Sequence, residues 1–225
     1  MGYYSIAIDG PSGAGKSTLA KKLAGDIGFI YVDTGAIYRT VGLYAQRKNI
    51  SCYEIHKVCE YFSDIKIGIK YDDTGLQHVY LNGEDVSEEI RLPEISTYAS
   101  TVSAVPQVRD FLLSLQRRFA DENNVIMDGR DIGTVVLPNA DLKIYLSADV
   151  KERARRRYLE LREKGVDTDY DEVLEDIKKR DCRDMNRKTA PLKMADDAVL
   201  LDTTDYDLAK SFEVLRQIVK DKLKI

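Results

Sequence analysis

The segment Gly10–Ser17 carries the residue types and the spacing that bind the phosphates of a nucleotide. It has the pattern G-x-x-x-x-G-K-S, and it lies between an apolar run typical of a buried strand and a helical pattern. Glycines let a backbone fold tightly around an anion, and the N-terminus of the following helix adds positive potential. Lys16 would contact the outer phosphates, and Ser17 would offer a hydroxyl to Mg²⁺. A glycine-rich turn before an ordinary helix is the alternative interpretation.

Three of the expected strands end in an aspartate: Asp9, Asp33 and Asp128. Because the carboxyl ends of parallel strands share one edge of a sheet, we expect the phosphate-binding loop, residues 34–39 and residues 129–131 to line one crevice. Asp128 is expected to hold Mg²⁺ through water, and capping of the next loop is its alternative role. Asp9 and Asp33 are expected to orient loops by accepting N–H bonds.

Arginines supply the other half of the expected chemistry. Arg39, Arg109 and Arg130 flank the expected crevice. A second group recurs at spacings of three and four, which places its members on one helical face, and it comprises Arg180, Arg183, Asp184 and Arg187. Guanidinium groups bind phosphate oxygens in a fork, and phosphoryl transfer needs such groups to position substrates and neutralise charge. For any single arginine, a place on a solvated helix face is the alternative.

The elements that must position these residues alternate between strands and helices. Strands are expected at 5–8, 29–32, 125–128, 142–146 and 198–201. Helices are expected at 17–27, 35–48, 51–61, from 106 to about 119, at 149–164, 169–188 and 207–223, and Ser51 with Glu54 would form a capping box for the third. This order predicts an α/β fold with a parallel sheet of about five strands and helices on both faces. Residues 65–71 and 76–81 have the period of two antiparallel strands, which indicates an inserted subdomain.

Composition limits the classes of function. The chain has 225 residues, 44% of them hydrophobic, and a net charge of −4, so no overall positive field would recruit nucleic acid. The three cysteines form no CxxC pair, which suits a reducing compartment. No apolar run would span a bilayer, and the first expected strand leaves no room for a signal peptide. We therefore expect a soluble, cytoplasmic protein that acts as a monomer, without nucleic acid or membrane partners.

Six segments, in this order, resemble the bacterial type of cytidylate kinase. They are GPSGAGKST at 10–18, DTGAIYR at 33–39, GEDVSEEIR at 83–91, ASTVSAVPQVR at 99–109, DGRDIGTVVLP at 128–138 and RDCRDMNR at 180–187. The first is shared with other nucleotide kinases, so the later segments carry the distinction. Thr34 stands where many members have serine, and Cys182 where many have aspartate.

The resemblance implies a P-loop fold like that of nucleoside monophosphate kinases. The core would comprise residues 1–62 and 104–225, with a helical lid at about 151–168 and an inserted nucleotide-binding subdomain at 63–103. The implied reaction transfers the γ-phosphoryl group of ATP, with Mg²⁺, to CMP or dCMP. It needs no general base, because a phosphate oxygen of the acceptor is already a nucleophile.

The resemblance also implies roles for individual residues. Catalysis would fall to Lys16, Arg130, Arg156 and Arg187. ATP would be bound by Gly10, Pro11, Ser12, Gly13, Ala14, Gly15, Lys16, Ser17 and Thr18. Mg²⁺ would be held by Ser17 and Asp128, and CMP by Thr34, Tyr38, Arg39, Ser100, Arg109, Arg130, Asp131, Arg180, Asp184 and Arg187.

Two other functions compete with this interpretation. One is a different small-molecule kinase, such as a guanylate kinase or a kinase for a non-nucleotide alcohol. The alcohol kinase would need a general base, and His56 and His78 stand without partners for that role. The other is a nucleotide-dependent switch or assembly ATPase that hydrolyses ATP without an acceptor.

Overall fold

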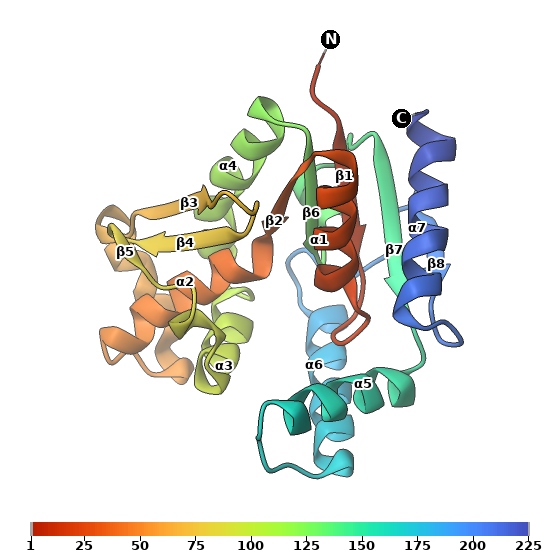
Figure 1. Ribbon diagram of the computed structural model, residues 1–225. Coiled ribbons are helices and arrows are strands. Elements are labelled where there is room, and N and C mark those ends of the chain that lie inside the picture. Colours follow the sequence, from red (N-terminus) through yellow and green to blue (C-terminus); the bar gives the residue numbers. More distant parts are fainter. Residues whose placement is uncertain (1, 225) are drawn as a thin grey trace.

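A five-stranded parallel sheet forms the centre of the protein. In this computed structural model, which describes residues 2–224, the strands lie in the order β2-β6-β1-β7-β8 (Figure 1). They are β1 (Ser5–Asp9), β2 (Ile30–Asp33), β6 (Val125–Gly129), β7 (Leu142–Ser147) and β8 (Val199–Asp202). The predicted parallel sheet is confirmed, and every predicted strand of the sheet lies within two residues of its predicted ends.

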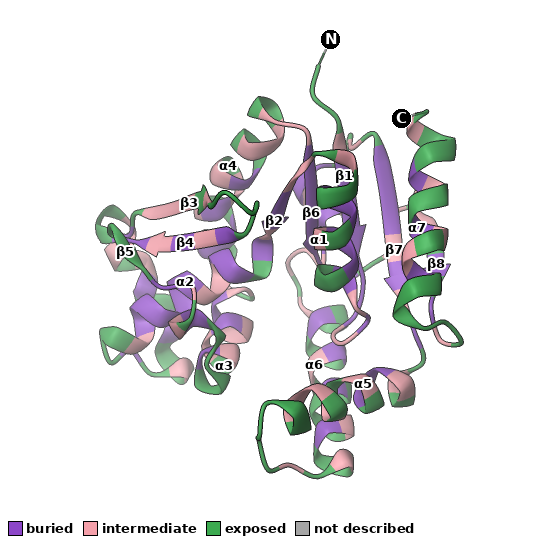
Figure 2. Ribbon diagram, in the orientation of Figure 1, coloured by how far each residue is buried: buried purple, intermediate pink, exposed green. Residues whose placement is uncertain are grey.

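Helices cover both faces of this sheet because successive side chains of a strand point to opposite sides. Ile6 and Ile8 of β1 pack with α1 (Lys16–Ile27) and α7 (Leu208–Leu223), whereas Ala7 packs on the other face. That second face is covered by α2 (Thr34–Arg47) and α4 (Pro106–Glu122). The central strands are almost wholly buried (Figure 2), so they form a rigid support for the loops at their ends.

The inserted segment forms a separate small antiparallel sheet, as predicted. It contains β3 (Ile67–Tyr71), β4 (Gln77–Leu81) and β5 (Glu84–Asp85), with the short 3₁₀ helix η2 (Glu89–Arg91) and α3 (Pro93–Val102) following. The Tyr71 hydroxyl donates to the Tyr31 carbonyl at 2.9 Å, and the Gln77 side chain accepts from the Asp33 amide at 2.9 Å. The hairpin is thereby joined to the end of β2.

The helix predicted from Ser51 is wrong in type. Residues Cys52–Asp64 form a 3₁₀ helix, η1, with non-helical dihedral angles at Glu54. Ser51 does accept the Tyr53 amide, but the Glu54 carboxylate pairs with Lys57 at 2.5 Å instead of returning to the Ser51 backbone. The expected reciprocal capping box is therefore absent from this part of the described chain.

Two charged helices extend away from the sheet as a separate arm (Figure 1). They are α5 (Val150–Glu163) and α6 (Tyr170–Asn186), and they pack on each other through a small cluster around Ala154, Val173 and Ile177. A single π-helical turn, η3 (Ile132–Val136), follows β6. Within residues 2–224, no helix is both long enough and apolar enough to cross a membrane.

Candidate active site

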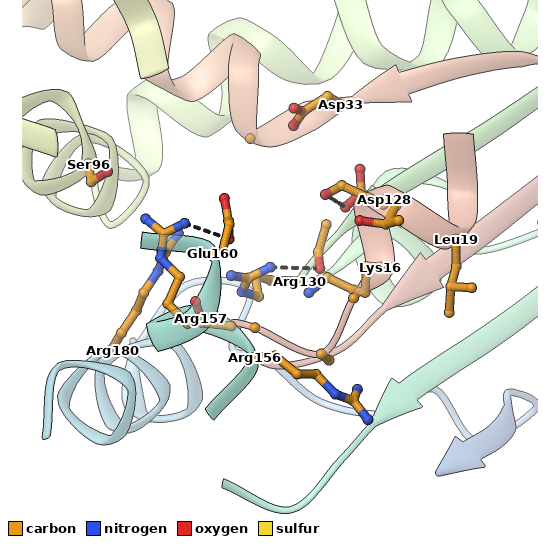
Figure 3. Close-up of a pocket in the computed structure, with 18 of the residues that line it drawn as sticks. Lys16, Leu19, Asp33, Ser96, Asp128, Arg130, Arg156, Arg157, Glu160 and Arg180 are labelled. Atoms are coloured by element: carbon orange, nitrogen blue, oxygen red, sulfur yellow. Dashed lines mark hydrogen bonds and ion pairs between the residues drawn. The ribbon is translucent and has the colours of Figure 1, made fainter. Parts of the chain in front are cut away.

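One large cleft opens at the carboxyl ends of the strands, between the sheet, the inserted segment and the α5–α6 arm (Figure 3). Its volume is about 1370 Å³. Most of the residues expected at the site line it: Ser12, Gly13, Ala14, Gly15, Lys16, Ser17, Thr18, Thr34, Tyr38, Arg39, Ser100, Arg109, Asp128, Arg130, Asp131, Arg156, Arg180, Asp184 and Arg187. Gly10 and Pro11 are not among the lining residues.

The loop after β1 has the conformation that the glycines allow. Gly10, Gly13 and Gly15 all have positive φ angles, and a side chain at Gly10 would collide with the Leu146 carbonyl of β7. Lys16, at the first turn of α1, is buried, and its Nζ donates to the Pro11 carbonyl at 2.7 Å. Burial and the neighbouring Arg130 lower the pKa of Lys16 well below its ordinary value.

Asp128 presents its carboxylate to the same loop. One oxygen accepts from the Ser17 hydroxyl at 2.9 Å and the other from the buried Tyr31 hydroxyl at 2.6 Å. Burial, and then repulsion from Asp33, raise the pKa of Asp128. The backbone carbonyl of Asp128 accepts from the Thr34 hydroxyl at 2.7 Å.

This donor set fits a magnesium ion that is held largely by a nucleotide. Ser17 and Asp128 offer hard oxygen ligands side by side, which is the type that Mg²⁺ prefers. Among the described residues, no group of three or more His, Cys, Asp or Glu side chains could hold a metal alone. Phosphate and water oxygens would therefore have to complete the coordination.

The expectation for the other two strand-end aspartates is confirmed. Asp9 accepts the amides of Ile132 and Gly133 at 2.8 and 2.7 Å, which fixes the turn after β6. Asp33 accepts the Ala36 amide at 3.0 Å and so caps α2. Both aspartates thus set the direction of loops that carry cleft residues.

Asp131 joins two of the expected arginines. Its carboxylate pairs with Arg109 on one side and with Arg187 at 3.0 Å on the other. The Arg109 guanidinium also lies 5.3 Å from the centre of the Tyr38 ring. These residues come from four separate stretches of sequence, so the fold brings them together as expected.

Arg130 and Arg180 differ in how their charges are balanced. Arg130 pairs with Asp184 at 2.8 Å. Burial acts to raise the pKa of Asp184, but Arg130 outweighs it and leaves this pKa below its ordinary value. Arg180 has no hydrogen bond or ion pair within residues 2–224, and burial beside Arg130 lowers its pKa to about 10. Arg39 donates to Ser96 at 3.0 Å and to the Ile90 carbonyl.

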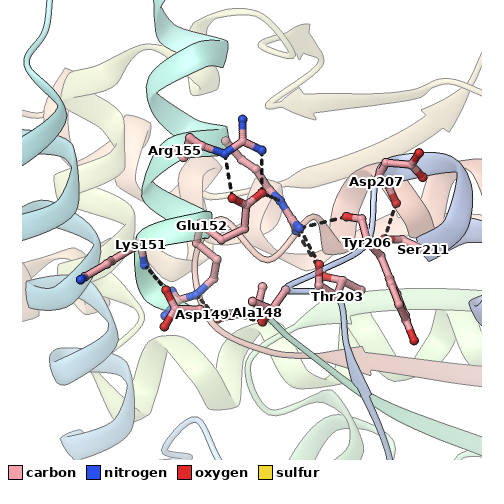
Figure 4. Close-up of polar contacts among 12 residues, drawn as sticks. Ala148, Asp149, Lys151, Glu152, Arg155, Thr203, Tyr206, Asp207 and Ser211 are labelled. Atoms are coloured by element: carbon pink, nitrogen blue, oxygen red, sulfur yellow. Dashed lines mark hydrogen bonds and ion pairs between the residues drawn. The ribbon is translucent and has the colours of Figure 1, made fainter.

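The arginines of α5 divide between two parts of the cleft. Figure 3 shows Arg157 near Arg180, whereas Arg156 points away from both. Arg157 pairs with Glu160 at 2.8 Å. Arg156 pairs with Glu152 and donates to the Thr203 carbonyl at 2.6 Å. Figure 4 shows these two partners, Glu152 and Thr203.

Besides Gly10 and Pro11, one further residue expected at the cleft lies outside it, and several lining residues were not expected. Arg183 was expected on the cleft side of α6, but it is exposed and lies outside the lining, because it falls at the edge of the helical face that Arg180 and Asp184 share. The missed lining residues have no motif of their own, and they include Ser96, Arg157, Glu160, Thr203, Tyr206, Asp207, Leu208 and Ser211.

Comparison with known proteins gives a consistent result over nearly the whole chain. Residues 6–221 match the family model described as cytidylate kinase. The chain is 51% identical to a cytidylate kinase of Caldicellulosiruptor bescii, covering 97% of this chain and 98% of that relative. It is 45% identical to a cytidylate kinase of Lactobacillus johnsonii, covering 97% and 95% of the two chains.

Among solved structures, the fold is similar to that of an uncharacterized protein from Eubacterium ventriosum. The TM-score is 0.53 at 15% sequence identity, with coverage of 97% of this chain and 98% of that one. At this identity the similarity concerns the fold alone.

Proposed function

Because the chain belongs to the cytidylate kinase family, whose reaction is the phosphorylation of CMP or dCMP by ATP, we propose that the two nucleotides meet in this cleft. The loop after β1 takes the phosphates of ATP, and the arginines on the opposite side take the phosphate of the acceptor. One observation carries this proposal: Lys16 and the pairs Arg130–Asp184 and Arg187–Asp131 line the same cavity.

The chemistry requires positioning rather than a base. An acceptor phosphate oxygen attacks the γ-phosphorus of ATP, a new P–O bond forms, and the bond to the β-phosphate oxygen breaks to release ADP. Lys16 neutralises charge on the transferred group, and Arg130 and Arg187 hold the acceptor phosphate together with Arg39. Arg180 lies close enough to Arg130 for the charge of Arg130 to lower its pKa, and with Asp184 it would face the ribose.

Mg²⁺ would be held by Ser17 and Asp128, the latter through water. The ion would neutralise phosphate charge when bound with ATP. The Tyr31 hydroxyl fixes one carboxylate oxygen of Asp128, so the other remains directed at Ser17.

The cytosine would be recognised by Thr34, Ser100, Arg109 and Asp131. Arg109 and Arg187 hold the Asp131 carboxylate in place from two sides, and a carboxylate oxygen can accept a hydrogen bond from an amino group of the base. A carbonyl at that position of the base would face the carboxylate as a second acceptor. This geometry favours an aminopyrimidine over uracil.

The ATP base would lie at the other end of the cleft. There the Arg156 guanidinium pairs with Glu152 and donates to the Thr203 and Tyr206 carbonyls. A guanidinium held in this way can stack on an aromatic base. We therefore assign Arg156 to ATP binding, away from the reacting phosphates. Action as a monomer in the cytoplasm stays a prediction from the sequence.

Steady-state assays with MgATP and a panel of acceptors test this proposal. CMP and dCMP should give the highest kcat/KM, with UMP below them and GMP and shikimate near background. Equal kcat/KM for CMP and GMP would contradict the assigned base site. Equal kcat/KM for CMP and UMP would contradict the role of Asp131.

A further inference from the structure

A buried ion pair behind the phosphate-binding loop takes no direct part in the proposed phosphoryl transfer. Arg153 of α5 and Asp181 of α6 pair at 2.6 Å, and both side chains are at most 10% exposed. Neither lines the cleft. Both are nevertheless bonded to Ser12, in the middle of the loop, which is remote from them in sequence.

The pair holds both backbone polar groups of Ser12. The second oxygen of Asp181 accepts the Ser12 amide at 3.1 Å, and Arg153 donates to the Ser12 carbonyl at 2.8 Å. Arg153 is itself fixed by a bond from its Nε to the Ala148 carbonyl at 2.8 Å. One peptide unit on each side of Ser12 is therefore tied to the α5–α6 arm.

Because peptide units are planar, the contacts on the arm side of the loop also fix which groups point to the opposite side, toward the cleft. In a trans peptide the C=O of one residue and the N–H of the next point in opposite directions, and the described chain has no cis peptide. Because the Ser12 N–H points toward Asp181, the Pro11 carbonyl must point away from Asp181, and there it accepts from Lys16 at 2.7 Å. Because the Ser12 carbonyl points toward Arg153, the Gly13 N–H must likewise point away from Arg153.

We infer that Arg153 and Asp181 are positioning residues for phosphoryl transfer, which set the two peptide planes that aim Lys16 and the Gly13 amide at the phosphates of ATP. Close packing supports this role, since a side chain at Gly13 would lie 3.3 Å from the Arg153 Cβ. The loop therefore has little freedom to rotate either peptide while the pair is intact. The inference rests on the proposed function of the loop in binding ATP.

The test uses two conservative variants of the whole enzyme. Asp181→Asn keeps the shape of the side chain and can still accept the Ser12 amide. It removes the ion pair, because Arg153 then faces an NH₂ group or a neutral oxygen. Arg153→Lys keeps the charge but cannot serve Asp181, Ser12 and Ala148 at once. Asp26→Asn is the control, because it breaks the Asp26–Arg216 pair of 2.7 Å between α1 and α7, away from the loop.

For each variant we would measure kcat, the KM for CMP, the inhibition constant of inorganic tripolyphosphate, and the unfolding midpoint. Tripolyphosphate occupies the loop without contacts to a base or ribose. In both loop variants its inhibition constant should rise and kcat should fall, each by roughly tenfold or more, with the KM for CMP within about twofold of wild type. The control should change only the unfolding midpoint.

The inference is overturned if the variants unfold at lower temperature while tripolyphosphate affinity and kcat stay within about twofold of wild type. The pair would then stabilise the fold only. If Asp181→Asn does not fold, Arg153→Lys decides by the same criteria. A wild-type enzyme that fails to phosphorylate CMP in this assay would refute the proposed function, whereas an active wild type with unaffected variants refutes the positioning role alone.

Discussion

At the level of single residues, the positive charges of the cleft are balanced in two different ways. Arg109, Arg130 and Arg187 are paired with carboxylates, which hold them in place before a nucleotide arrives. Lys16 instead donates to a backbone carbonyl, so its charge is not neutralised by a direct ion pair. A charge held ready in a buried site interacts strongly with a developing anion, which is the requirement for transition-state stabilisation.

Replacing Lys16 with alanine should lower kcat strongly without unfolding the protein. We expect a loss of roughly 100- to 1000-fold in kcat, because one preorganised charge near the transferred phosphoryl group is removed. The unfolding midpoint should not fall by much, since a costly buried ammonium leaves with the side chain. Steady-state kinetics and a thermal melt measure the two effects, and an unchanged kcat would exclude Lys16 from the mechanism.

Replacing Arg187 with alanine should affect the acceptor more than the donor. The KM for CMP should rise by about tenfold or more, while the KM for ATP stays near the wild-type value, because Arg187 contributes a charged hydrogen bond on the acceptor side. Arg183→Ala is a matched control on the preceding turn of α6, exposed and outside the cleft. An equal rise in the KM values for CMP and ATP, or the same rise in the Arg183→Ala control, would contradict the assignment of Arg187 to the acceptor site.

Asp9 gives a prediction for the pH dependence of stability. Burial raises its pKa to about 6 from 3.8, so the folded state binds this proton more tightly than the unfolded chain does. The stabilising contribution of the protonated form is therefore complete below about pH 4 and is lost as pH rises through about 6. The unfolding free energy of wild type, minus that of Asp9→Asn, should fall by about 2 kcal/mol from pH 4 to pH 7.

Denaturant unfolding of both proteins at several pH values measures that difference. Parallel pH profiles for the two proteins would show that Asp9 titrates normally in the folded state. Burial at the end of β1 would then not perturb the pKa of this carboxyl group.

Sequence reasoning identified single residues well where a motif fixed both their type and their neighbours. The loop residues from Ser12 to Thr18 all line the cleft. It did less well on α5, where Arg156 and Arg157 are adjacent and differ by about 100° around the helix. Which of the two faces the phosphates depends on the roll of α5 against α6, and no local pattern encodes that roll.

At the level of elements, the strand ends determine where the chemistry can occur. Asp33 lies opposite Asp128, and Asp9 lies opposite Gly129, in the register of the parallel sheet. The three loops that follow must therefore start side by side. Alternation of strand and helix predicted this arrangement, because parallel strands in such a sheet end at one edge.

The close approach of β1 to β7 makes Gly10 the least replaceable glycine of the loop. Gly10→Ala should lower the unfolding free energy by roughly 3 kcal/mol or more, because the added methyl group meets backbone that cannot move aside. ATP binding should be lost with it, because the loop would shift. Thermal unfolding and ATP titration measure both effects.

Gly25→Ala is the matched control for that substitution. Gly25 lies in the exposed part of α1 with open space at its Cβ position, so alanine should raise the stability by about 1 kcal/mol. Equal effects of the two substitutions would show that the contact with Leu146 does not constrain the loop.

The predicted element that was wrong in type has a clear physical origin. The pattern S-x-x-E at Ser51 suggested a capped α-helix, but the pattern does not specify what the glutamate contacts. Lys57 lies one turn further on and takes the Glu54 carboxylate. Strands with apolar runs, such as β1 and β6, depend on burial and not on the choice of a polar partner, and their ends were predicted closely.

At the scale of the whole molecule, the cleft is formed by three parts. The sheet supplies the phosphate-binding loop, the inserted segment supplies one wall through α3, and the α5–α6 arm supplies the opposite wall. We expect the arm to close when both nucleotides are bound, because only then would water be excluded from the γ-phosphoryl group. Without the acceptor the arm stays open and the catalytic site is incomplete, so we expect little hydrolysis of ATP.

The most direct test of this account is the consumption of MgATP by the wild-type enzyme with and without CMP, followed as ADP and CDP together. CMP should raise ADP production by at least about 100-fold, with one CDP formed for each ADP, because the acceptor phosphate is the nucleophile and completes the closed site. Similar ADP production with and without CMP, or ADP without matching CDP, would contradict a transfer between two nucleotides held in one cleft.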